Sequence, residues 1–329
     1  MSKDTPGNIA KERPLSYLPV GLFGAVMGLT GLSVAWQLAY VRYGVPEAIS
    51  QSIGVVAALA FTLLVGGYLV KLVGDPAAVR SEFLHPIAGN MFGTVLISML
   101  LLPIVLAQVD LFLARCLWTV GVVAMLPFAW SVVDRWMDVR QRLVDVTPAW
   151  VVPVVGLIDV PLAMPALHLE SMHGLMVFSL AVGLFFAIPL FTLIFFRLVL
   201  ESPLPASLQP TLMILLAPFA VGTSAYIATT GEVDLFAMSL FALTLFLLVV
   251  LGGRLRYVDR TPFRVVWWAT SFPLAAAAIS GMRIAEAFHG WIVDTVTLCL
   301  LAVATLTILW LLVRTVMGIL QGELRTICS

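Results

Sequence analysis

One acidic residue lies deep inside an apolar segment and is the first candidate for chemistry. Asp159 stands in VVGLIDVPLAMP, eleven residues after Pro148. At about 1.5 Å of rise per helical residue, this spacing puts the carboxyl about 16 Å along a helix that starts at the proline. An ionisable group at such depth in a bilayer is costly and often functional. The sequence leaves two main roles open, a protonated or paired structural acid and a proton-coupling group.

The remaining polar candidates form no recognisable enzyme site. His168, Glu170 and His173 share the segment ALHLESMHG, but their spacing matches neither HExxH nor a usual zinc pattern. His85 precedes Pro86 at a helix start and is expected to cap it. The sequence contains no Ser/His/Asp set, no phosphate-binding glycine loop and no dinucleotide fingerprint. We therefore expect no enzyme, no metal site and no cofactor.

The segments that carry these residues are too apolar for a soluble protein. Of 329 residues, 61% are hydrophobic and 11% are charged, whereas soluble domains are roughly half apolar and about a quarter charged. Ten stretches reach the roughly 20 apolar residues of a spanning helix: 20–39, 53–73, 87–107, 111–131, 149–167, 175–197, 211–230, 235–251, 265–285 and 291–313. This predicts an all-α integral membrane protein with a ten-helix domain at 19–320 between tails at 1–18 and 321–329. The short connectors leave no room for a nucleic-acid-binding domain.

The basic residues lie almost wholly on one side of this predicted topology. Of the eighteen Lys and Arg residues, only Arg42, Arg115 and Arg283 fall on the other side. Cytoplasmic loops are enriched in Lys and Arg. We therefore expect both termini in the cytoplasm.

Five prolines recur at or just before the start of every odd-numbered span. Pro19, Pro86, Pro148, Pro210 and Pro262 are separated by 67, 62, 62 and 52 residues. Proline suits the first turn of a helix, because its missing N–H had no helical partner there. The spacing predicts five helix hairpins.

Interior glycines and prolines are concentrated in the odd spans, whereas most even spans are uniformly apolar. Small residues let helices approach closely, and broken backbone is tolerated in a bilayer only against protein or a wet cavity. This favours odd helices around a lumen over close packing without a pore. The candidates for lining or breaking these helices are Gly24, Gly28, Pro103, Pro161, Pro218 and Pro273.

Parallel inner helices would gather their N-termini at one mouth. Each N-terminus carries roughly half a positive charge, so such a ring favours anions. Arg264, near Arg254, Arg256 and Arg260, would add to this attraction at the cytoplasmic mouth. At the outer end, Arg283 either pairs with Glu286, three residues on, or serves as an anion ligand.

Four strings resemble those of the tellurite-resistance/dicarboxylate transporter family, which includes bacterial TehA and the slow anion channels of plant guard cells. They are YLPVGLFGAVMGLTGLSVAW at 17–36, HPIAGNMFGT at 85–94, TPAWVVPVVG at 147–156 and WWATSFPLAAAAISGM at 267–282. The resemblance implies ten helices as quasi-fivefold hairpins, odd helices lining a central pore, and a homotrimer in a bacterial inner membrane. It also implies transport of small anions and a phenylalanine on the ninth helix that closes the pore.

The residue that matches this phenylalanine is Phe272. It lies ten residues after Pro262, or about 15 Å along a helix, near the middle of a bilayer core about 30 Å thick. The adjacent Pro273 removes a backbone hydrogen bond and can bend the helix.

Three functions stay open at this point. An anion channel is favoured, because proton-coupled carriers usually hold several ionisable groups near the midplane and this chain has only Asp159 there. The alternative is a proton-coupled carrier or exporter of a dicarboxylate, sulfite or a tellurium oxyanion. The third is a membrane protein without transport activity.

Overall fold

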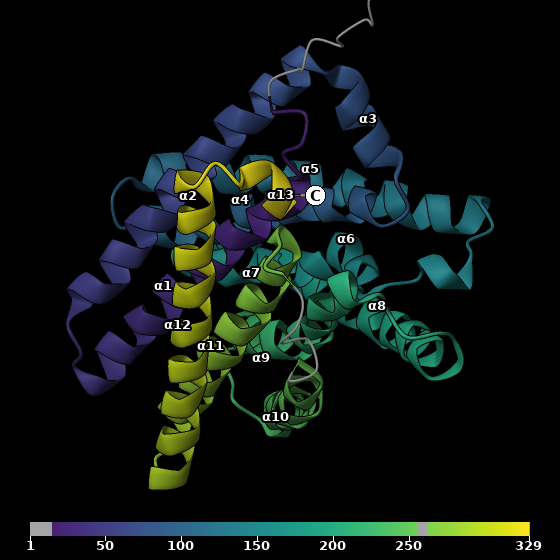
Figure 1. The fold of residues 1–329 in the computed structure, drawn as a ribbon. Helices are drawn as coiled ribbons and strands as arrows, with labels where there is room; N and C mark the ends of the chain where they lie inside the picture. Colours follow the sequence, from purple (N-terminus) through teal and green to yellow (C-terminus); the bar gives the residue numbers. More distant parts are fainter. Residues whose placement is uncertain (1–14, 256–261, 329) are drawn as a thin grey trace, which may run out of the picture.

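The computed structural model describes residues 15–255 and 262–328, and every regular element in these ranges is a helix (Figure 1). The α-helices are α1 (Gly24–Tyr43), α2 (Glu47–Gly74), α3 (Pro76–Leu84), α4 (Phe92–Leu106), α5 (Leu111–Asp138), α6 (Val151–Val155), α7 (Val160–Ala163), α8 (His173–Leu200), α9 (Ala217–Thr230), α10 (Leu235–Leu255), α11 (Ser271–Ala287), α12 (Trp291–Leu320) and α13 (Leu324–Cys328).

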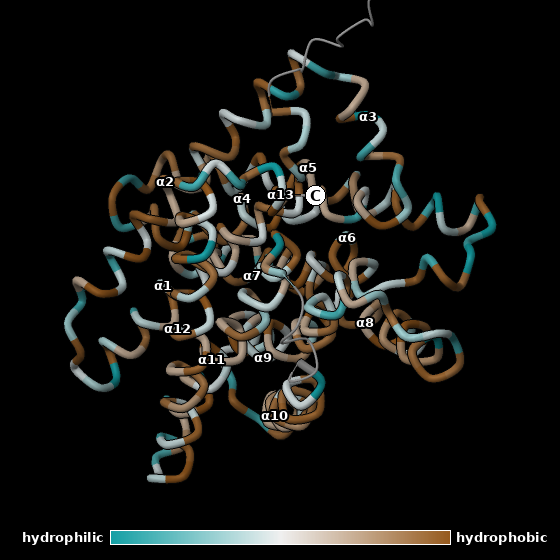
Figure 2. Tube along the Cα trace, in the orientation of Figure 1, coloured by the Kyte–Doolittle hydropathy of each residue, from teal (hydrophilic) through white to brown (hydrophobic). Residues whose placement is uncertain are grey.

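Within the described ranges, nine helices are long and apolar enough to cross a membrane. The predicted fifth span is shorter, covering Pro148–Ala163. It is divided into α6, a 3-10 turn η5 (Gly156–Asp159) and α7, with Pro153 in α6 and Pro161 in α7. Proline interrupts helical hydrogen bonding, and the break at η5 lies between the two prolines. Figure 2 shows hydrophobic residues dominating the helices, with hydrophilic positions gathered at connections and helix ends.

Each of the five odd spans begins with a 3-10 segment. These segments are η1 (Val20–Phe23), η2 (Ala88–Met91), η4 (Pro148–Trp150), η7 (Ala206–Leu216) and η9 (Val265–Thr270). Several are held by hydroxyls that donate to the carbonyl three residues back, at 2.6 Å for Thr94, 2.6 Å for Thr211 and 2.8 Å for Thr270. The tight turns follow from prolines and hydroxyl residues at the helix starts, where 3-10 geometry is common.

These 3-10 segments contact one another in a closed order, η1 to η2 to η4 to η7 to η9 and back to η1. The α-helices that follow repeat this order, since α1 contacts α4, α4 contacts α7, α7 contacts α9, α9 contacts α11 and α11 contacts α1. The five inner helices therefore run parallel around a common centre. We call the end at which they start the N-terminal end of the ring.

The other helices lie outside this ring. Figure 1 shows α2, α8, α10 and α12 at the periphery. In the most apolar 18-residue stretch, 56% to 78% of residues are buried in the long inner spans, against 11% to 33% in the outer spans. Exposed apolar surface over a whole helix is what a lipid-facing element requires.

The first and ninth spans approach most closely at a glycine. A Cβ atom at Gly28 would overlap the side chain of Ser271, whereas a Cβ atom at Gly24 would lie 3.7 Å from the carbonyl oxygen of Trp268. The Ser271 hydroxyl also donates to the carbonyl of Gly24 at 3.2 Å. Absence of a side chain at Gly28 is therefore what lets α1 and α11 pack at this distance.

Gly28→Ala is expected to lower the free energy of unfolding by about 1–3 kcal/mol, because an added methyl group in a filled contact forces its neighbours to move. Gly24→Ala is the matched control on the same helix, and its effect is expected to stay within about 1 kcal/mol, because alanine favours helix over glycine. The measurement is the thermal unfolding midpoint of each variant in detergent. Equal midpoints for the two variants would contradict the packing argument.

Candidate functional site

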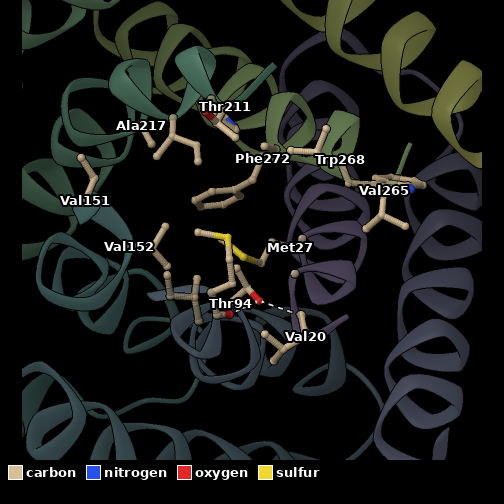
Figure 3. Close-up of a pocket in the computed structure, with 18 of the residues that line it drawn as sticks. Val20, Met27, Thr94, Val151, Val152, Thr211, Ala217, Val265, Trp268 and Phe272 are labelled. Carbon is tan, nitrogen blue, oxygen red and sulfur yellow. Dashed lines mark hydrogen bonds between the residues drawn. The ribbon is translucent and has the colours of Figure 1, made fainter. Parts of the chain in front are cut away.

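A cavity of about 400 Å³ lies inside the N-terminal end of the ring. All five inner spans, counted with their 3-10 segments and with α6 and η5 of the fifth span, contribute to its wall; one residue from each is Met27, Ile97, Val155, Val221 and Trp268. Figure 3 shows apolar side chains turned toward its centre from several helices. The cavity is concave and mostly apolar, as small-ligand sites usually are.

Phe272 belongs to the wall of this cavity. Its side chain comes from the first turn of α11, is 7% exposed, and points into the centre of the cavity in Figure 3, near Met27 and Val152. A Cβ atom at Gly31 would lie 3.5 Å from the Phe272 ring, so the ring rests against a position of α1 that has no side chain. The ring is thus held inside the cavity against α1.

Asp159 also lies in the deep wall of the cavity. The residue is 3% exposed, and its Oδ1 has no hydrogen-bond partner among the described residues. The charges of Arg42, Lys71 and Arg283 are each paired elsewhere. A buried carboxylate without a cation is costly, so the site contains an acid that its surroundings do not balance.

A second acidic residue lies at the N-terminal end of the cavity wall. Glu82 of α3 accepts hydrogen bonds from the backbone N–H of Val20 at 2.7 Å, from the Tyr68 hydroxyl at 3.0 Å and from Lys71 Nζ at 2.6 Å. Lys71 also donates to the carbonyl of Leu18 at 2.6 Å. The carboxylate therefore occupies the positive N-terminus of the first span. One of the five helix ends predicted to attract anions already carries a negative partner.

The sequence-predicted residues divide into two groups. Gly24, Pro218, Pro273 and Arg264 lie in the cavity wall together with Phe272 and Asp159. Outside the wall are Gly28 at the α1–α11 contact, Pro103 inside α4, Pro161 in α7, and Arg283, which pairs with Glu286 at 3.3 Å on α11.

The basic cluster predicted near the mouth is only partly described. Arg264 directly precedes η9 and lines the cavity. Arg254 is exposed near the end of α10. Arg256 and Arg260 fall outside the described residues. At the start of the third span, His85 Nδ1 accepts hydrogen bonds from the backbone N–H of Ile87 and Ala88, as a capping residue does.

The C-terminal helix α13 covers part of the N-terminal end of the cavity. A turn at Gly322, with φ of +73°, reverses the chain after α12, and Ile327 and Cys328 line the cavity. Ile327 is 6% exposed and packs on Gly318, while Arg325 lies over the ring of Tyr17, 5.6 Å from its centroid. Two residues of the segment predicted as a tail, 321–329, therefore line the cavity.

Burial raises the pKa of the Cys328 thiol to about 11, although nearby Lys71 lowers it to a smaller extent. An ordinary thiol has a pKa of about 8.5. At pH 8 the fraction of Cys328 present as the reactive thiolate is therefore lower than that of an ordinary thiol by roughly two orders of magnitude. We expect alkylation of Cys328 by iodoacetamide to be slower by about that factor in folded than in denatured protein. Cys116→Ser and Cys299→Ser remove the two exposed thiols from the measurement. Equal rates in folded and denatured protein would contradict the position of α13.

Sequence reasoning missed Glu82 and the two cavity residues of α13. Glu82 reaches Val20 across 62 residues, and no local pattern reports such a contact. A glycine shortly after an apolar helix indicates a turn at the C-terminus of that helix. Gly322 could therefore have predicted the turn that precedes α13.

Comparison with known proteins agrees with this architecture. A family model described as voltage-dependent anion channel, SLAC1, matches residues 17–316. The chain is 27% identical over 306 residues to S-type anion channel SLAH3 of Arabidopsis thaliana, which covers 91% of this chain and 48% of the plant protein.

Two further relatives match over nearly their whole length. An uncharacterized transporter of Methanocaldococcus jannaschii is 29% identical over 328 residues, covering 92% of this chain and 95% of the relative. The tellurite resistance protein TehA homolog of Haemophilus influenzae is 27% identical over 323 residues, covering 96% and 94%. The chain thus spans about half of the plant relative and almost all of the two microbial ones. The family match over most of the sequence confirms the resemblance seen in its four strings, and the chain belongs to the SLAC1 family of anion channels and transporters, which includes the TehA homologue.

Proposed function

We propose that this protein is an anion channel whose pore runs between the five inner helices and is closed by Phe272. The observation that carries the proposal is the cavity itself, which is walled by all five inner spans and has the Phe272 ring at its centre. An apolar constriction can close a pore by excluding water. Removal of the Phe272 side chain would then connect the cavity with the C-terminal ends of the five inner helices.

The repeated architecture supports a quasi-fivefold arrangement of five hairpins with the odd helices around the pore. Each inner helix starts with a 3-10 segment and is followed by a more exposed outer helix. The one-sided distribution of Lys and Arg supports an N-terminal end of the ring that faces the cytoplasm, with both chain termini on that side of a bacterial inner membrane. A homotrimer with one pore per protomer is part of the same proposal, by similarity to the family.

The wall of the cavity suits passage of small inorganic or organic anions rather than tight binding. Helix N-termini and Arg264 supply positive potential at the mouth, and Glu82 reduces it at the first span. Conduction requires that an ion bind well enough to enter and weakly enough to leave. Weak attraction by helix ends meets this requirement better than buried fixed cations.

The test is electrical. Purified protein and its Phe272→Ala variant are placed in a planar bilayer under a chloride gradient, with equal pH on both sides and then with a pH gradient. A channel gives a reversal potential that follows the anion Nernst potential whatever the pH gradient. Absence of anion current from both folded proteins would contradict the proposal.

A proton-coupled carrier or exporter of a dicarboxylate, sulfite or a tellurium oxyanion is the second candidate, because Asp159 is a buried acid without a partner in the described chain. A coupled carrier shifts its reversal potential with the pH gradient. Asp159→Asn, which cannot release a proton, abolishes that shift if Asp159 is the coupling group. The same recordings therefore separate the two candidates.

A further inference from the structure

Buried polar atoms without partners are few in the described chain, and half of the residues concerned lie on the inner helices near Phe272. The residues with such side-chain atoms are Thr30, Thr147, Asp159, Ser179, Arg197 and Ser224. Thr30, Asp159 and Ser224 come from α1, η5 and α9, three different members of the ring. We call these three residues the polar belt.

Thr30 lies at the depth of the Phe272 ring. It is three residues beyond Met27, the deepest cavity-lining residue of α1, and so lies nearly on the same helix face one turn further. The next residue, Gly31, faces the Phe272 ring. Thr30 is fully buried and does not line the cavity, so its hydroxyl is shielded from the cavity in this closed arrangement.

Ser224 has the matching position on α9. It lies three residues beyond Val221, the deepest cavity-lining residue of that helix, and is 5% exposed. Asp159 lines the cavity from the fifth span, and α9 contacts both η5 and α11. The three residues of the belt thus come from three different spans of the ring, and Thr30 and Ser224 lie one helical turn beyond a cavity-lining residue.

The hydroxyls of the belt differ from most others in these helices. A hydroxyl in an apolar helix usually donates to the carbonyl four residues earlier, and this is so for Thr62, Thr119, Thr192, Thr223, Thr229, Thr305 and Thr315. Thr30 and Ser224 make no such bond. Their O–H groups are available to a ligand, whereas the hydroxyl of Thr223, the residue before Ser224, already donates to a backbone carbonyl.

We propose that the polar belt is a binding site for a partly dehydrated monovalent anion, chloride or nitrate, at the level of the Phe272 gate. The inference rests on the proposed channel function and names the groups that select the ion. Thr30 and Ser224 donate through their hydroxyls, and Asp159 donates as a carboxylic acid, since a carboxylate would repel the ion. Three O–H donors replace part of the water that the anion loses at the phenylalanine.

This chemistry predicts an order of permeability. Chloride holds its hydration water more strongly than nitrate, so it depends more on replacement donors when it is dehydrated. Removing a belt hydroxyl should therefore disfavour chloride relative to nitrate. Arg197 and Ser179, the unpartnered residues of α8, lie on an outer helix and carry no part of this argument.

The experiment uses bi-ionic reversal potentials in the Phe272→Ala background, with chloride on one side and nitrate on the other. Thr30→Val and Ser224→Ala are each expected to raise the nitrate-to-chloride permeability ratio by about threefold to tenfold, the factor associated with loss of a single hydrogen bond. Thr223→Val is the matched control, because its buried hydroxyl already donates to the Phe219 carbonyl at 2.8 Å. Asp159→Asn keeps a donor and should preserve the ratio, whereas Asp159→Leu should raise it.

An unchanged ratio in both Thr30→Val and Ser224→Ala overturns the inference, as does an equal change in Thr223→Val. Crystals of the Phe272→Ala variant soaked in sodium bromide give a second readout that needs no current. An anomalous bromide peak among the three belt side chains supports the site, and its absence overturns it. If the Phe272→Ala variant conducts no anion but binds bromide at the belt, the channel proposal fails while the site stands.

Discussion

Phe272→Ala is expected to raise the anion current of this protein by at least about tenfold, the effect of lowering a barrier by about 1.4 kcal/mol. Phe272 is almost fully buried, and its ring occupies the centre of the cavity. Alanine leaves the backbone of α11 intact and removes the group that excludes water and ions there. The measurement is macroscopic current at fixed voltage, normalised to the amount of folded protein in the membrane.

Phe23→Ala is the matched control for this prediction. Phe23 is 2% exposed and packs with Phe61 and Tyr68 on the outward side of the first span, outside the cavity wall. Its replacement should lower stability, as loss of a buried aromatic ring does, without raising the current. A current that stays at the wild-type level in folded Phe272→Ala would exclude the ring as the gate.

The second large effect is expected at the mouth of the cavity. Glu82→Ala should lower the free energy of unfolding by about 3–5 kcal/mol, because it leaves a buried ammonium without its counter-charge. The side chains of Lys71 and Glu82 are only 4% and 13% exposed, and their charged atoms are 2.6 Å apart. The substitution also removes the acceptor of the Val20 N–H. Chemical or thermal unfolding in detergent measures the change.

Two variants test the cause of that loss. Adding Lys71→Met to Glu82→Ala removes the unpaired charge and should recover part of the stability, since an apolar replacement of a buried ion pair is often tolerated. Glu286→Ala breaks the Arg283–Glu286 pair, in which both side chains are 39% exposed, and should cost less than about 1 kcal/mol. Similar losses in Glu82→Ala and Glu286→Ala would argue against a special role for burial at Glu82.

Much of the architecture was predictable because it depends on local composition. The length of the apolar stretches predicted an all-helical membrane protein, and nine long apolar helices are present in the described ranges. The five prolines at helix starts predicted a repeated unit, and each start carries a 3-10 segment. The predicted fifth span was too long, because Pro153 and Pro161 divide it into short pieces that length alone did not distinguish.

The candidate site was predictable only in part. Phe272 and Asp159 could be selected from the family resemblance and from the position of a lone acid in an apolar segment, and both lie in the cavity wall. The sequence could not distinguish glycines and prolines that line the cavity from those that only pack against neighbouring helices, because both kinds occur in similar apolar segments. Gly24 lines the cavity and Gly28 fits against Ser271, yet they are one helical turn apart.

The sequence by itself determined that the protein is helical, lies in a membrane, concentrates its basic residues on one side and contains five repeated helix starts, because each property is a sum over neighbouring residues. Only the tertiary structure decided which polar groups find partners. Glu82 reaches the Val20 N–H from 62 residues away, and α13 folds back over the cavity. The side-chain hydroxyls of Thr30 and Ser224 have no hydrogen-bond partner among the described residues. Hydrogen bonding depends on distances and directions between helices far apart in the chain, which no local pattern contains.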